Sequence, residues 1–254
     1  MKGGTAINLF VQDFPRLSVD IDVVFTDHSI DRDGALQAIA ADLAAARSAI
    51  VGLGYRAQLP RTKAGDDVKL LVETSGARVK VEVNFVFRGT LLPVVRTHLT
   101  EAAQDLFTTD VEVPVLDRSE LYGSKLVAAM DLFGWQPGFV DCFVAYLAGH
   151  NRPVHEVLFP RKLPLNPTFD NEFVGMTRAP IDLAKLQQVQ DRLFDELARA
   201  LTIAHREFLL SLVRAEPQWD LMPFAHLAQL PALQWKLLNL RNLRSRNRRR
   251  FDQQ

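Results

Sequence analysis

The sequence is poor in cysteine and has no excess of charge of either sign. The one cysteine among its 254 residues, Cys142, excludes a framework of intrachain disulfides and is typical of a reducing compartment. It lies in the apolar stretch FVDCFVAYLAG, which predicts a buried and unreactive thiol. Lys plus Arg and Asp plus Glu both number 30, so the net charge is zero. A net charge of zero excludes a protein that coats nucleic acid with a uniformly basic surface, although it does not exclude a local basic patch.

Several common signatures are missing as well. No apolar run reaches the length of a membrane span, and the N-terminus lacks the pattern of a secretory signal peptide. We therefore expect a cytoplasmic protein that has no membrane partner. The fingerprints of serine hydrolases, P-loop ATPases and dinucleotide-binding dehydrogenases are absent, so these three classes are set aside.

What is present is the composition of an ordinary globular protein. Hydrophobic residues make up 48% and charged residues 24%, which excludes a disordered chain. A length of 254 residues suits one large domain or two modest ones. The first part alternates strand-like and helix-like stretches, whereas the rest is helical. We predict an α+β protein, with an α/β domain of mixed sheet over 1–115 and a helical domain with a basic tail over 116–254.

Local patterns predict the elements of the first domain. Residues 19–25 alternate apolar and acidic side chains, which predicts a half-buried strand. Residues 34–51 have helical spacing, with Asp31 or Asp33 as the cap and glycines at the end. Residues 69–74 and 78–87 predict a hairpin that turns at Ser75-Gly76.

The second domain is predicted to be helical throughout, apart from one loop-rich connection. A helix is expected to open with Ser119 as its cap, and residues 138–149 predict an apolar helix. Five prolines make 150–180 loop-rich. Residues 181–214 have a long helical periodicity, and 223–243 predict a last helix or a helix pair broken at Pro231.

Two short segments near the N-terminus carry the strongest chemical signal. Gly3-Gly4-Thr5 leads into a helix, and glycines and a helix start favour close approach of a phosphate; the alternative is a plain tight turn. In Ser18-Val19-Asp20-Ile21-Asp22, residues two apart share one face of a strand. Two such carboxylates repel by roughly 4 kcal/mol at an effective dielectric near 20, so a compensating cation such as Mg²⁺ is expected. The alternative is a solvated polar face.

Glu82 lies on the polar face of the predicted strand 78–87. A third carboxylate on a neighbouring strand would complete a metal site and help to activate an attacking hydroxyl. Alternatively, Glu82 is a surface residue paired with Lys80 or Arg78.

Read together, these segments resemble the nucleotidyltransferase superfold of the polymerase β type, and more closely its AbiEii/AbiGii toxin branch. The strings KGGTAINLF and PRLSVDIDVVF match that family's signature, and ELYGSKL, with Lys125, matches its next landmark. The resemblance implies a nucleotidyltransferase-like fold and a toxin of a bacterial toxin–antitoxin or phage-defence (abortive infection) pair. It implies Mg²⁺ or Mn²⁺ as cofactor, NTP as substrate, transfer of a nucleotide onto RNA such as tRNA, and a cognate antitoxin as partner.

The resemblance also implies roles for individual residues. Asp20 and Asp22 would hold the metal, with Glu82 as a weaker third carboxylate. The phosphates would be contacted by Gly3, Gly4, Thr5, Ser18 and Lys125, of which Lys125 neutralises charge.

The sequence departs from the family pattern in two places. The family has a helix and a strand before Gly-Gly-Thr, so their absence predicts an exposed edge beside the aspartate strand and a loosely anchored glycine turn. The family also continues past its lysine with an Arg-Asp-x-x-Asp stretch, where this chain has Asp131 and a short apolar run. We interpret this as an internal deletion. Two alternatives therefore stay open: a catalytically degenerate relative that binds a nucleotide or a partner, and a kinase-like phosphotransferase that uses the same site.

The C-terminal segment is strongly basic. Such a run can bind an RNA backbone; the alternative is a solvated helix end with cations at the negative end of the dipole. Its arginines are Arg241, Arg244, Arg246, Arg248, Arg249 and Arg250.

Overall fold

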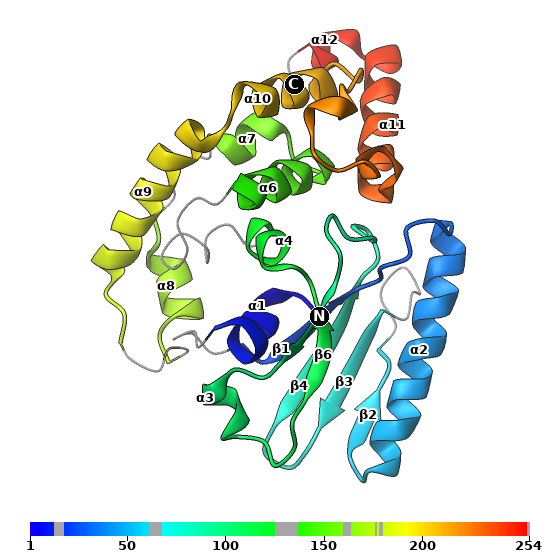
Figure 1. Ribbon diagram of the computed structural model, residues 1–254, viewed down its shortest axis with the longest axis vertical. Coiled ribbons are helices and arrows are strands. Elements are labelled where there is room, and N and C mark those ends of the chain that lie inside the picture. The colour runs from blue at the N-terminus through cyan, green and yellow to red at the C-terminus, as the bar shows by residue number, and fades with distance from the viewer. Residues whose placement is uncertain are drawn as a thin grey trace. The chain divides into compact units, whose positions relative to one another are not determined.

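The structure is a computed structural model that describes residues 1–12, 18–60, 68–124, 137–159, 164–175, 177 and 180–252. The chain divides into two compact units, Met1–Leu116 and Asp117–Gln254 (Figure 1). The first unit holds the strands and the second is helical. The α+β class predicted from the sequence is confirmed.

The first unit is built on a four-stranded sheet with the order β1-β4-β3-β2. β1 runs parallel to β4, and the other neighbours are antiparallel, so the sheet is mixed. Its strands are β1 (Asp20–Val24), β2 (Arg56–Gln58), β3 (Lys69–Glu73) and β4 (Arg78–Asn84). The predicted hairpin is confirmed as β3 and β4, in which Glu73 opposes Arg78 across the turn. The same unit also contains an antiparallel pair, β5 (Val95–His98) and β6 (Glu112–Val115), with the short helix α3 (Glu101–Gln104) between them in sequence.

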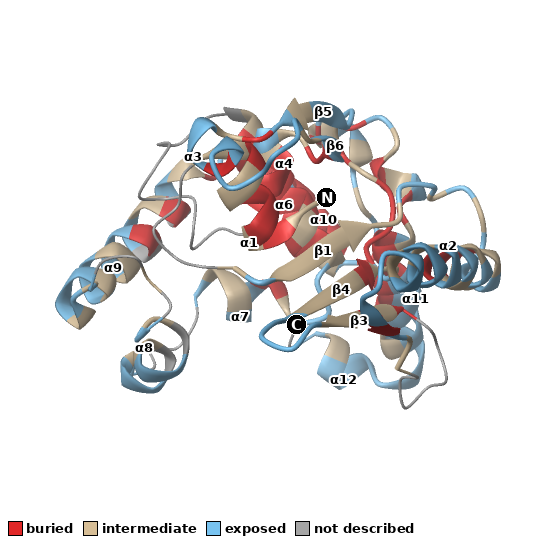
Figure 2. Cartoon of the chain, turned by 90° about the horizontal axis from the view of Figure 1, so that it is seen from below, coloured by how far each residue is buried: buried red, intermediate tan, exposed pale blue. Residues whose placement is uncertain are grey.

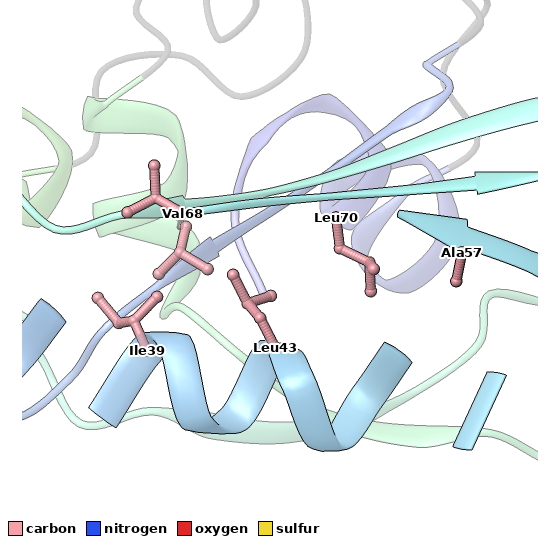
Figure 3. Packing of buried hydrophobic residues seen from close by; sticks show 6 residues of the cluster. Ile39, Leu43, Ala57, Val68 and Leu70 are labelled. Carbon is pink, nitrogen blue, oxygen red and sulfur yellow. The ribbon is translucent and has the colours of Figure 1, made fainter. Parts of the chain in front are cut away.

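One long helix, α2 (Arg32–Gly52), packs on one face of this sheet. It begins at Arg32, two residues before the predicted start, and Asp31 is the cap of the two that were predicted, because its carboxylate accepts a hydrogen bond of 2.7 Å from the Gly34 N–H. Ile39 and Leu43 point from α2 toward the sheet, Ile39 in the direction of Val68 (Figure 3). Valines of β1 and β4 join this cluster. Since side chains alternate along a strand, the polar residues of β1 and β4 lie on the opposite face of the sheet.

By length and average hydropathy, α2 could also cross a membrane, and it is the one helix in the described ranges that passes this test. The sequence expectation that no segment reaches this length is therefore wrong for α2. The signal is weak, because the core helix of a globular protein passes the same test. Here Ile39 and Leu43 are buried against the sheet.

The second unit consists of short and medium helices. Its central element, α6, is buried along most of its length (Figure 2). The helices are α4 (Arg118–Gly123), α6 (Pro137–Gly149), α7 (Val154–Leu158), α8 (Asn166–Glu172), α9 (Leu183–Ala200), α10 (Ile203–Val213), α11 (Pro231–Arg246) and α12 (Arg248–Phe251), with 3₁₀ turns η2 (Trp219–Leu221) and η3 (Leu227–Gln229).

Three sequence predictions about this unit need correction. The cap of α4 is Asp117, whose carboxylate accepts a 2.8 Å hydrogen bond from the Ser119 N–H, so Ser119 is not the cap. Residues 150–180 contain α7 and α8 and are less loop-rich than expected. The periodicity of 181–214 belongs to two helices, because Thr202 begins a new one with a capping box. The predicted helix pair with its break at Pro231 is confirmed, because η3 ends at Gln229 and Pro231 starts α11, whose first turn tolerates proline.

Candidate active site

The glycine turn lies directly against the aspartate strand. α1 (Gly3–Ala6) continues into a π-helical segment, η1 (Ile7–Val11). Gly3 has φ +81°, and a Cβ on it would overlap the Asp22 carboxylate. A Cβ on Gly4 would lie 2.8 Å from the Ser18 hydroxyl oxygen. Both positions favour glycine because the side chains of Asp22 and Ser18 approach the backbone closely. At Gly3 the positive φ favours glycine as well.

Hydrogen bonds fasten this turn to the strand. The Lys2 N–H donates to the Asp22 carbonyl at 2.9 Å, which forms an antiparallel bridge on the outer edge of β1. The buried Thr5 hydroxyl donates to the Asp20 carbonyl, and it also lies 3.0 Å from the Ser18 hydroxyl in a second hydrogen bond. The expected loose turn is therefore wrong. β1 does lie at the edge of the sheet, as expected, although Lys2 covers part of it.

Lysines form ion pairs with two carboxylates on the polar face of the sheet, those of Asp20 and Glu82. Parallel pairing of β1 with β4 sets Asp20 beside Lys80 and Asp22 beside Glu82. The Lys80 ammonium lies 3.0 Å from Asp20 Oδ2 and 3.1 Å from Glu82 Oε2. The other oxygen of Glu82, Oε1, is 3.0 Å from the Lys69 ammonium on β3. Lys80 therefore compensates the charge of Asp20, one of the two aspartates whose mutual repulsion led us to expect a cation.

These contacts set the ionisation of the site. The hydrogen bond from Lys69, and after it that from Lys80, lowers the pKa of Glu82. Hydrogen bonds to Asp20 and Glu82 raise the pKa of Lys80. Glu82 is therefore a carboxylate at neutral pH and, held by two ammonium groups, a poor proton acceptor. Its pairing with Lys80 is one that the sequence allowed, whereas Arg78 pairs with Glu73 at 2.6 Å instead.

The donor chemistry fits a divalent cation. Carboxylate oxygens from two adjacent strands converge on the Lys80 ammonium, so the fold already builds one cation position. Magnesium takes one or two protein carboxylates together with substrate phosphates. Among the described residues, no three His, Cys, Asp or Glu side chains gather as a ready metal-binding group. The carboxylates on this face are those of Asp20 and Asp22 on β1 and of Glu82 on β4, and Asp22 lies opposite Glu82 in the strand register.

The other predicted residues belong to the second unit, Asp117–Gln254. Lys125 and Asp131 fall outside the described residues. The six C-terminal arginines are exposed on α11 and α12, where Arg244 forms an ion pair of 2.8 Å with Glu216. Cys142 is buried in α6, which confirms the predicted burial, and desolvation raises the pKa of its thiol, so its low reactivity stays a prediction.

Sequence reasoning missed the part played by Lys69. A signal was present, because a hairpin that turns at Ser75-Gly76 and sets Glu73 opposite Arg78 also sets Lys69 opposite Glu82. The contact of Lys80 with Asp20 depends on the parallel pairing of β1 with β4, which no local pattern encodes.

Comparison with known proteins identifies the family. No curated protein matches the chain. A solved structure, MenT4, a nucleotidyltransferase toxin from Mycobacterium tuberculosis H37Rv, has the same fold, with a TM-score of 0.59 at 17% identity over 94% of this chain and 83% of that one. The sequence model described as nucleotidyl transferase AbiEii toxin, type IV toxin–antitoxin system, matches residues 1–137. This match confirms the resemblance seen in the sequence. The chain belongs to the AbiEii family of nucleotidyltransferase toxins of type IV toxin–antitoxin systems.

Proposed function

We propose that this toxin uses Mg²⁺ or Mn²⁺ to transfer a nucleotide from an NTP to a hydroxyl group of an RNA acceptor such as tRNA. One observation carries the proposal: the glycine turn is docked on the strand that bears Asp20 and Asp22. Backbone amides of a helix start and a pair of carboxylates therefore lie on one edge of one sheet. This combination suits a phosphate chain accompanied by a metal.

Each part of the site has a separate task in this proposal. The first amides of α1 have no partner within the helix, and Lys2 supplies no side-chain cap, so they suit a phosphate oxygen. The Thr5 hydroxyl is already bonded to the strand, so we assign Thr5 a positioning role, together with Ser18. Asp20 and Asp22 would hold the metal with help from Glu82. A divalent ion bound there would neutralise phosphate charge and would lower the pKa of the attacking hydroxyl.

In the reaction the acceptor oxygen bonds to the α-phosphorus, and the bond from that phosphorus to the pyrophosphate oxygen breaks. The acceptor hydroxyl loses its proton to solvent water, and pyrophosphate leaves with the electron pair of the broken bond. Glu82 is held by Lys69 and Lys80, so we assign it to holding charge and not to accepting that proton. Lys125 keeps the proposed role of neutralising phosphate.

Two partners complete the proposal. The exposed arginines of α11 and α12 supply cations for an RNA backbone, and binding there should weaken steeply as salt is raised. Membership of a type IV system implies a cognate antitoxin. NTP and RNA as substrates would place the protein's action in the cytoplasm.

A labelling experiment tests the reaction type. Purified protein is incubated with total RNA, Mg²⁺ and each NTP, labelled on either the α- or the γ-phosphate. We expect α-label on RNA and none after Asp20→Asn, whose melting should change little because the Asp20 side chain is 45% exposed. The matched control is Asp42→Asn, which makes the same change on the exposed surface of α2.

Other label patterns would contradict the proposal. Transfer of the γ-label alone would indicate the kinase-like alternative. No transfer, with NTP binding that Asp20→Asn abolishes, would indicate a degenerate nucleotide-binding relative. Transfer that survives Asp20→Asn would remove Asp20 from the mechanism.

A further inference from the structure

The Lys80 ammonium lies between the carboxylates of Asp20 and Glu82, which the proposed function assigns to the metal. The ammonium contacts Asp20 Oδ2 at 3.0 Å on one strand and Glu82 Oε2 at 3.1 Å on its own strand. Lys69, by contrast, contacts Glu82 alone. Lys80 is therefore the one described side chain seen to bridge Asp20 to Glu82 by ion pairs.

A divalent ion and the Lys80 ammonium cannot share these oxygens. Both are positive, and at hydrogen-bond separation their repulsion opposes joint occupancy. Holding a metal through Asp20 and Glu82 thus requires the ammonium to leave.

The ammonium is able to leave. The Lys80 side chain is 33% exposed, and ion pairs of such exposure contribute little to stability. Lysine also carries its charge on a flexible four-carbon stem, so it can move aside while β4 stays in place. A freed ammonium is a strong donor to phosphate oxygens.

We propose that Lys80 is a tethered counter-cation, which neutralises Asp20 and Glu82 when no nucleotide is bound and gives way to the divalent ion that arrives with an NTP. The nucleotide phosphates then receive the released ammonium. Metal and nucleotide each favour the binding of the other. The metal displaces the Lys80 ammonium from the carboxylates, and the phosphates bind the displaced ammonium. This inference rests on the proposed function, since it takes Asp20 and Glu82 as metal ligands.

The test measures Mn²⁺ binding without turnover. Free Mn²⁺ is quantified by electron paramagnetic resonance, first alone and then with each of four α,β-methylene nucleoside triphosphates. The variants are Lys80→Met, which keeps the apolar stem, and Lys80→Arg, which keeps the charge. The matched control is Arg78→Gln, which removes a cation two residues earlier on the same strand that pairs with Glu73.

We expect Lys80→Met to bind Mn²⁺ alone about tenfold more tightly than the native protein. In this variant Mn²⁺ no longer has to break the two exposed ion pairs that the Lys80 ammonium forms with the carboxylates. Addition of the nucleotide analogue should then improve Mn²⁺ binding less in Lys80→Met than in the native protein. Lys80→Arg and Arg78→Gln should both behave as the native protein does.

Failure of the Lys80 exchange and failure of the proposed function would give different results. If the native protein binds Mn²⁺ with an analogue but Lys80→Met binds Mn²⁺ alone no more tightly, the exchange is wrong and the proposed function stands. If no variant binds Mn²⁺ with any analogue, the metal–nucleotide function fails and the exchange fails with it. If Lys80→Met and Lys80→Arg both fail to fold, Lys80 is a structural residue and the exchange is overturned.

Discussion

Replacing Gly3 with alanine tests how tightly the glycine turn is docked on the aspartate strand. Two effects act together at this position. The first is the backbone: Gly3 has φ +81°, a conformation that costs a residue with a side chain about 1–3 kcal/mol. The second is the neighbour: the new Cβ would overlap the Asp22 carboxylate and lie 3.0 Å from Asp22 Cβ.

Gly54 separates these two effects. It has φ +88°, and a Cβ on it would meet nothing within 4 Å. Gly54→Ala should therefore lower the free energy of unfolding by the backbone term alone, about 1–3 kcal/mol. Gly3→Ala should lower the free energy of unfolding by the same amount plus about 1 kcal/mol, because moving Asp22 also disturbs the hydrogen bond that its carbonyl accepts from the Lys2 N–H.

The assay is urea unfolding of both variants together with binding of Mg-NTP by calorimetry. We expect Gly3→Ala to lose nucleotide binding and Gly54→Ala to keep it. Equal stability of the two variants, with nucleotide binding intact in both, would refute the docked arrangement of the turn.

Three further predictions concern the scaffold. Asp31→Ala removes the cap of α2 and should lower the free energy of unfolding by about 1 kcal/mol, measured in urea. Leu43→Ala should lower the free energy of unfolding by about 2–5 kcal/mol, because the Leu43 side chain is 5% exposed in the core. Leu53 is 75% exposed, so Leu53→Ala should change the free energy of unfolding by less than about 0.5 kcal/mol. Similar losses in the two variants would disprove the assigned core. The single thiol, Cys142, should react with a thiol reagent at pH 8 far more slowly in the native protein than in urea, since burial both hides the thiol and raises its pKa; rapid native labelling would show that α6 is accessible.

The sequence predicted best what local chemistry decides. The strand with Asp20 and Asp22 follows from a period of two, and the start of α2 follows from the cap at Asp31. The hairpin follows from Ser75-Gly76. In each case a few neighbouring residues carry the whole signal.

What sequence reasoning could not predict depends on contacts between distant segments. The lysine between Asp20 and Glu82 arises only when β1 pairs in parallel with β4, about sixty residues away in the chain. The firm docking of the glycine turn was also missed, because it depends on the hydrogen bond that the Thr5 hydroxyl donates to the Asp20 carbonyl on the strand. The break before α10 could have been found, since Thr202 is a good cap residue, but the unbroken apolar spacing hid it.

The most direct test of the account is whether the turn and the aspartate strand form one metal–nucleotide site. Thermal unfolding is followed with Mg²⁺ and each NTP, for the native protein and for Asp20→Asn. A ligand at one hundred times its dissociation constant stabilises the folded state by about 2.7 kcal/mol. We predict stabilisation by Mg-NTP that is lost in Asp20→Asn. A cooperative transition that no Mg-NTP shifts, or one that shifts equally in Asp20→Asn, would contradict the account.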